Sequence, residues 1–260
     1  VEKDQLTSHG KPVFLYDYFS KSMGNPTSDS RLYNDHLGNI DWPESVALQC
    51  VNEDGSFALP RLHEVTQHPD TKVGYTMLWH KEQPDWVAEK DPEAVKGQSL
   101  FIGYDIDNPM MRDYWHKLLK RVGTDTRGKK ANRLGFILAN EPHWFSEYAH
   151  WTHKHGEMAE LSRYTKNKFR NWLRATYNGD IDRLNILWGT TFAIFQDIDL
   201  EWPLVAKELW GKPVWYDWCR FNMDRGLEWC RFLQDALRAG NPEADTSVKI
   251  MPTVFTEERR

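Results

Sequence analysis

A carboxylate beside an amide and two ring side chains is the arrangement in this sequence best suited to chemistry. Residues 134–144, LGFILANEPHW, place Asn140 and Glu141 directly after an apolar stretch, with His143 and Trp144 close behind. A carboxylic acid can protonate a glycosidic oxygen, an amide can hydrogen-bond the neighbouring sugar hydroxyl, and rings can line the pocket. A glutamate that only forms a salt bridge at the end of a strand is the alternative, because so short a motif also occurs by chance.

The residues before Glu141 predict a buried strand that ends at this candidate site. Phe136, Ile137 and Leu138 form an apolar run of strand length, and Pro142 cannot donate a ladder hydrogen bond, so the strand must stop near Asn140. In a (β/α)8 barrel the catalytic residues stand at the carboxyl ends of the parallel strands. The position of Glu141 therefore favours a catalytic role.

Strand-like and helical runs alternate along the chain, which is typical of βα units around a parallel sheet. Besides the strand before Glu141, strands are expected at residues 13–16, 45–51, 72–79 and 248–255. Helices are expected within residues 57–67, at 110–122 with Asn108 as N-cap, within 158–177 and at 214–239.

This pattern predicts five or six strands in 260 residues, fewer than the eight of a closed barrel. We therefore expect residues 1–260 to form one catalytic (β/α)8-barrel domain that lacks its C-terminal strands.

Composition narrows the function classes. Lys and Arg number 33 against 38 Asp and Glu, with the signs interspersed, so nucleic acid is not an expected partner. No apolar run approaches the roughly 20 residues of a membrane span, so no membrane partner is expected either. Three cysteines without metal-ligand spacing, Cys50, Cys219 and Cys230, are predicted to be buried thiols.

Aromatic residues suggest a carbohydrate ligand, because the flat C–H faces of sugars stack on indole rings and this chain has 13 tryptophans. Trp79 and His80 end the strand predicted at residues 72–79, on the same edge as Glu141, and are candidates for sugar stacking or hydroxyl binding. Trp86 is a similar candidate. Core packing is the alternative for the tryptophans.

Two further groups of polar residues give weaker indications of a functional site. In the sequence GYDIDNP, Asp105 is a candidate substrate ligand and Asp107 a candidate helix cap. His150, His153 and His155 do not share one helical face, so we expect solvated loop histidines and no metal site.

The segment FRNWLRATYNGDIDRLNILWGTTFAIF, residues 169–195, resembles the segment that follows the acid/base strand in a clan of retaining glycoside hydrolases. That clan includes the family 42 β-galactosidases, and the order of Trp79-His80, Asp105 and Asn140-Glu141 is similar to its layout. The sequences GYDIDNP and NEPHW, with Ala139 where family 42 usually has an acidic residue, resemble the family 50 β-agarases more closely.

The resemblance implies a (β/α)8 barrel, no cofactor in the chemical step, and retention of configuration through a glycosyl-enzyme intermediate. It implies that Glu141 is the general acid/base and that Asn140 binds the 2-hydroxyl. The nucleophile is then a second glutamate roughly 5 Å away, at the end of the seventh strand. Glu257, just past the strand predicted at residues 248–255, is a candidate, but a solvated terminal charge is favoured there, so we expect the nucleophile beyond Arg260.

Together these observations predict a glycosidase that cleaves β-galactosidic linkages in a galactan, agarose or neoagaro-oligosaccharides above all. A β-galactosidase acting on small oligosaccharides is one alternative, and a non-catalytic carbohydrate-binding barrel is another. The expected partners are the galactan and the remaining polypeptide of the same enzyme. Secretion, or location in the periplasm, is expected.

Overall fold

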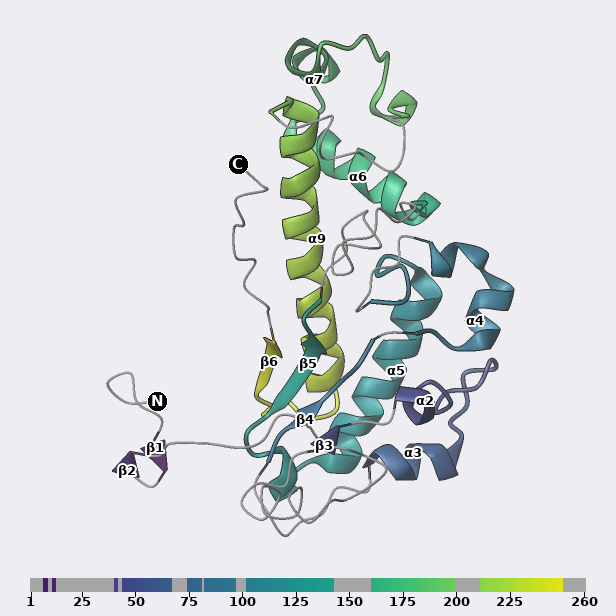
Figure 1. Ribbon diagram of the computed structural model, residues 1–260, viewed down its shortest axis with the longest axis vertical. Coiled ribbons are helices and arrows are strands. Elements are labelled where there is room, and N and C mark those ends of the chain that lie inside the picture. The colour runs from purple at the N-terminus through teal and green to yellow at the C-terminus, as the bar shows by residue number, and fades with distance from the viewer. Residues whose placement is uncertain are drawn as a thin grey trace, which may run out of the picture.

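The computed structural model describes residues 7–8, 11–12, 40–41, 44–66, 74–80, 82–96, 102–142, 160–199 and 211–249 (Figure 1). Near the N-terminus, β1 (Thr7–Ser8) and β2 (Lys11–Pro12) form a two-stranded antiparallel sheet.

The main sheet has four strands in the order β3 (Ile40–Asp41), β4 (Thr76–Met77), β5 (Phe136–Asn140) and β6 (Thr246–Lys249). Every neighbouring pair is parallel. Because strands adjacent in the sheet are also consecutive in the chain, each connection crosses back over the sheet, as in the βα units of a barrel. The strand predicted before Glu141 is β5, and the expected parallel α/β fold is confirmed.

Helices fill each of these connections. Between β3 and β4 lie α2 (Glu44–Ala47) and α3 (Leu59–Thr66). Between β4 and β5 lie α4 (Asp85–Lys90), η1 (Pro92–Val95), α5 (Pro109–Thr126) and η2 (Lys130–Asn132). Between β5 and β6 lie α6 (Arg163–Thr176), α7 (Ile181–Trp188), η3 (Phe195–Asp197) and α9 (Pro213–Arg238).

The long helix α9 runs from the sheet to α6 and α7 (Figure 1). It contributes residues to two hydrophobic clusters, which we call the sheet cluster and the helical cluster. Its C-terminal half packs with α5 against the sheet in the sheet cluster, which includes Trp115, Leu138 and Trp229. Its N-terminal half packs with α6 and α7 in the helical cluster, which includes Phe169 and Trp218. The helical cluster therefore extends the domain beyond the sheet.

One predicted strand is wrong. In residues 45–51, Ser45 to Ala47 belong to α2, and Val51 makes only an isolated antiparallel bridge with Phe57. The run SVALQCV is apolar at both helical and strand spacing, so periodicity alone could not separate the two states. Within the described sheet, the strand that ends at Asn140 is the third of four in chain order. The strand predicted at residues 13–16 lies outside the described residues, as does the end of the last strand, 250–255.

The thiols fit the expectation in part. Cys50 is buried, Cys219 and Cys230 are half-buried, and all three are free cysteines. Across the described ranges, no helix is both long and apolar enough to cross a membrane.

Candidate active site

Glu141 lies at the carboxyl end of β5, as the sequence predicted. Its backbone N–H donates to the carbonyl oxygen of Lys249 at 2.7 Å, and its carboxylate Oε1 lies 2.7 Å from Lys249 Nζ. The Glu141 side chain is 17% exposed, so solvent reaches it. Its backbone φ is +48°, in the left-handed region that few residues other than glycine adopt. Such conformations cluster at functional sites, where the surrounding structure holds them in place.

Asn140, beside Glu141, has an unused acceptor. The residue is 6% exposed, and its Oδ1 atom is buried without a hydrogen-bond partner among the described residues. A buried amide oxygen is costly to leave without a donor. A sugar hydroxyl is a donor of the right kind, which agrees with the role predicted for Asn140.

Trp79 and His80 lie just past β4 and differ in burial. His80 faces the helices α5 and α9, where its ring lies 4.3 Å from that of Trp115 and 5.2 Å from that of Trp229. His80 is 1% exposed and both ring nitrogens have protein partners, so the prediction that it binds substrate is wrong. Trp79 is half-buried, and the prediction that it binds substrate stays open.

Trp86 packs towards the protein interior. It lies on α4 against the sheet cluster, with its ring 6.4 Å from that of Tyr114. The core-packing alternative for Trp86 therefore describes its observed contacts.

Asp105 is closed off from any ligand. Its carboxylate is fully buried and accepts hydrogen bonds from Arg225 Nη2 at 3.0 Å, Thr165 Oγ1 at 2.9 Å and Ser162 Oγ. Burial raises the pKa of Asp105, although the charge of Arg225 acts in the opposite direction. The prediction that Asp105 contacts substrate is therefore corrected: it ties α6 to α9.

Asp107 is also part of this ion-pair network and does not cap α5. Asn108 is the cap, as one prediction had it, because its Oδ1 accepts from the backbone N–H groups of Met110 and Met111. Asp107 accepts from Arg225 Nε at 2.5 Å and Lys168 Nζ at 2.6 Å. Burial opposes ionisation, yet these two cations hold the pKa of Asp107 below its usual value.

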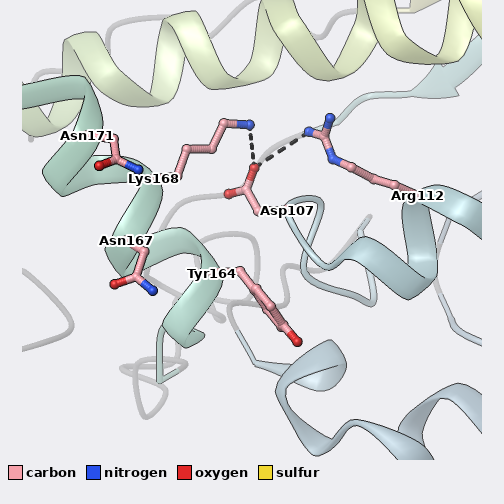
Figure 2. Close-up of a pocket in the computed structure, with 6 residues that line it drawn as sticks. All are labelled: Asp107, Arg112, Tyr164, Asn167, Lys168 and Asn171. Carbon is pink, nitrogen blue, oxygen red and sulfur yellow. Dashed lines mark hydrogen bonds and ion pairs between the residues drawn. The ribbon is translucent and has the colours of Figure 1, made fainter. Parts of the chain in front are cut away.

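A depression of about 360 Å³ lies between α5 and α6 at the exposed side of this network. Figure 2 shows the side chains that line it. Lys168 forms ion pairs with Asp107 and Glu228. The guanidinium of Arg112 forms a bidentate ion pair with the Glu228 carboxylate, with N–O distances of 2.6 and 2.7 Å. Carboxylates of the same network already neutralise the charges of these cations. The network therefore serves as a structural connection between α5, α6 and α9. Sequence reasoning missed it, since Arg112, Lys168 and Glu228 look like ordinary surface charges in the sequence.

The candidate site residues His143, Trp144 and Glu257 lie outside the described residues, as do His150, His153 and His155, which were expected to be solvated loop histidines. Among the residues that are described, no group of three or more His, Cys, Asp or Glu side chains is placed to hold a metal ion.

A parallel βα sheet with an Asn-Glu pair at the carboxyl end of a strand is the architecture of (β/α)8-barrel glycoside hydrolases. Residues 80–258 match the family model of glycoside hydrolase family 42, described as β-galactosidase. The match covers more than half of the chain, and the protein belongs to this family.

Solved structures agree with this assignment. The chain is similar to a family 42 exo-carrageenase from Bacteroides ovatus, with 32% identity and a TM-score of 0.82 over 97% of this chain and 33% of that one. The β-galactosidase of Bacillus circulans sp. alkalophilus shares the fold, with 17% identity and a TM-score of 0.57 over 83% of this chain and 36% of that one.

A sequence relative points to the same family. A β-galactosidase from Halorubrum lacusprofundi is 36% identical over 80 residues, which are 29% of this chain and 11% of the relative. The chain spans about a third of the length of the solved structures that it resembles.

The closer likeness to family 50 that the sequence suggested is not supported, because the family model that matches is that of family 42. One of the features behind that suggestion has a structural explanation. Ala139 is fully buried in the sheet cluster, where a small apolar side chain fits, so its identity reflects packing.

Proposed function

We propose that the protein is a retaining glycoside hydrolase that cleaves β-galactosidic linkages, with Glu141 as the general acid/base. The observation that carries this proposal is the partly exposed Glu141 carboxylate at the carboxyl end of β5, next to Oδ1 of Asn140, which has no hydrogen-bond partner among the described residues. Membership of family 42 supports it.

In the first step of this mechanism, Glu141 donates its proton to the glycosidic oxygen while a second carboxylate attacks the anomeric carbon. The bond to the leaving sugar breaks as the bond to the enzyme forms. In the second step, the Glu141 carboxylate takes a proton from water, which displaces the enzyme carboxylate and restores the original configuration. Asn140 orients the sugar through its 2-hydroxyl. We propose that the second carboxylate comes from polypeptide beyond Arg260, in preference to Glu257.

For the substrate we propose a galactan, agarose or neoagaro-oligosaccharides among them. Similarity to an exo-carrageenase supports this class, since carrageenan is itself a galactan. A polymer of this kind does not cross membranes unaided, so we also propose that the enzyme is secreted or periplasmic. The second candidate, a β-galactosidase acting on small oligosaccharides, is favoured by the description of the family model and by the Halorubrum relative.

Product analysis with the full-length protein separates these candidates. Wild-type protein is incubated with agarose, carrageenan and lactose, and the released sugars are identified by mass spectrometry. Release of oligosaccharides from a polymer supports the galactan proposal, whereas cleavage of lactose alone supports the second candidate. Failure to cleave any β-galactoside would overturn both.

The role of Glu141 is tested by Glu141→Gln, which keeps the size of the side chain but removes its exchangeable acid proton. Activity on the natural substrate should fall by a factor of about 10² to 10⁴, the usual contribution of a general acid. Substrate binding should persist. Glu243, an exposed glutamate after α9, provides the matched control, and Glu243→Gln should retain full activity. Near-normal activity of Glu141→Gln would eliminate the assigned role.

A further inference from the structure

The strand that presents Glu141 contains an irregularity just before Asn140. Phe136 and Ile137 pair with Thr246 and Ser247, but the next pair joins Asn140 to Lys249. The pairing therefore advances three residues on β5 and only two on β6. One extra residue is inserted into β5, which is a β-bulge.

Burial shows the same insertion. Leu138 and Ala139 are neighbours in the sequence, yet both belong to the sheet cluster on the helix-covered face. A regular strand cannot place consecutive side chains on one face. Without the bulge, Asn140 would share the helix-covered face with Phe136 and Leu138. With it, Asn140 returns to the opposite face, and the chain leaves the strand at Glu141.

The bulge also redirects a carbonyl group. The carbonyl oxygens of Gly135 and Ile137 accept from the amides of Thr76 and Leu78, at 3.1 and 2.9 Å. Carbonyls alternate along a strand, so the carbonyl of Leu138, the residue after Ile137, would regularly face β6. Instead, its oxygen lies 2.7 Å from Nε2 of His80, a residue just past β4.

The partners of His80 determine its tautomer. A carbonyl oxygen can only accept, so Nε2 must carry the proton that is donated to Leu138. Nδ1 is then the acceptor and lies 2.8 Å from the hydroxyl of Tyr104, which donates to it. Trp115 from α5 and Trp229 from α9 pack against the ring, which is 1% exposed. Each nitrogen of this neutral imidazole is therefore used, and the ring has little room to rotate.

We infer that His80 is a positioning residue: by holding the Leu138 carbonyl at the bulge, it fixes the direction in which Asn140 and Glu141 leave β5. This inference rests on the proposed function of Glu141 for its catalytic consequence, although the bulge itself does not. The left-handed backbone of Glu141 agrees with it, since a strained residue persists only where its surroundings hold it.

The kinetic test compares two aryl β-galactosides in the full-length protein. A dinitrophenyl group leaves without protonation, whereas a phenyl group needs the proton of Glu141. His80→Phe keeps a ring but loses both hydrogen bonds. It should lower kcat/KM for the phenyl substrate at least tenfold and change kcat/KM for the dinitrophenyl substrate by less than about threefold. His80→Gln, whose amide can still donate to Leu138, should recover most of the loss.

Two further variants serve as controls that distinguish a specific effect on Glu141 from a general loss of structure. Tyr104→Phe removes only the donor to Nδ1 and should show a smaller loss with the same selectivity. Phe169→Leu, in the helical cluster, should lower the melting temperature without changing the ratio of the two kcat/KM values. Equal losses on both substrates in His80→Phe, or a failure of His80→Gln to recover activity, would overturn the inference.

A readout without substrate separates this inference from the proposed function. Hydrogen exchange of the backbone amides of residues 139–141 should be at least tenfold faster in His80→Phe than in wild-type protein, and close to wild type in His80→Gln. If the wild-type protein cleaves no galactoside, the proposed function fails while this exchange pattern still supports the bulge assignment. Unchanged exchange in His80→Phe would contradict the assignment whatever the activity.

Discussion

At the residue scale, Asp105 and Arg225 form a buried ion pair on which the stability of the fold is expected to depend. Their side chains are 0% and 2% exposed and lie 3.0 Å apart. Charges so far from water are tolerated only when they are paired and hydrogen-bonded. The pair links the segment before α5 to α9. Hydrogen bonds from Ser162 and Thr165 to Asp105 connect α6 to the same ion pair.

Arg225→Met should lower the free energy of unfolding by about 3–5 kcal/mol, because it leaves a buried carboxylate without its counter-charge. Urea denaturation followed by circular dichroism measures the loss. The double variant Asp105→Leu with Arg225→Met should recover part of it, since no unpaired charge then remains. A loss below about 1 kcal/mol in the single variant would mean that Asp105 finds another partner.

His80 should make stability depend on pH. Burial lowers its pKa from 6.5 to about 4, against a smaller opposing effect of its bond to Leu138. The rings packed on it, Tyr104, Trp115 and Trp229, carry no charge. Between pH 6.5 and 4 the unfolded chain binds a proton that the folded chain does not, so stability is complete above pH 6.5 and falls towards pH 4.

The expected loss from this one group is about 3 kcal/mol over that interval. Urea denaturation at a series of pH values measures it in wild-type protein and in His80→Gln, which cannot take up the proton. The wild-type curve should be steeper between pH 6.5 and 4. Parallel curves for the two proteins would show that His80 titrates equally in the folded and unfolded states.

At the scale of elements, the contact between α5 and α9 depends on glycine. A Cβ atom added to Gly123 in α5 would lie 2.5 Å from the carbonyl oxygen of Leu237, and one added to Gly240 after α9 would meet the carbonyl oxygen of Lys120. Both obstacles are backbone atoms, which cannot rotate away. The two helices can approach this closely only because these positions lack a side chain.

Gly123→Ala tests this contact. In an exposed helix the change would stabilise the protein by about 1 kcal/mol, because alanine is the better helix former. Here we expect the opposite sign, a loss of about 1–3 kcal/mol from overpacking. Thermal denaturation measures it, and a raised melting temperature would contradict the close approach.

Elements with several independent signals were predicted well from the sequence. For α5, Asn108 and Pro109 mark the start, and a long amphipathic run follows. For β5, an apolar run ends at a proline. The segment at residues 45–51 had only an apolar run, and the packing of Ala47 and Cys50 into the sheet cluster decided it in favour of a helix and turn.

At the scale of the whole molecule, the described main sheet has two edges, β3 and β6, whereas a barrel joins its first and last strands. We predict that a structure of the full-length protein will show further parallel strands closing this sheet. It should also place a glutamate carboxylate roughly 5 Å from that of Glu141, the separation found in retaining enzymes. A separation of 6.5–9.5 Å would indicate an inverting mechanism instead.

The same reasoning predicts that residues 1–260, expressed alone, are inactive and poorly soluble. Activity on galactan oligosaccharides, together with size-exclusion chromatography, checks this. An active, stable monomer would make Glu257 the nucleophile by elimination.

The sequence by itself determined the βα order, the strand that ends at Asn140, the place of Glu141 at its carboxyl end and the cap of α5. Each of these depends on residues close together in the chain. Only the tertiary structure decided the roles of His80 and Asp105, because their partners Leu138 and Arg225 lie 58 and 120 residues away. The bulge in β5 also required the structure, since register depends on the neighbouring strand. A polar residue of a given type can either bind a ligand or stabilise the fold. Its burial distinguishes these two roles, and burial depends on packing against residues that are distant in the sequence.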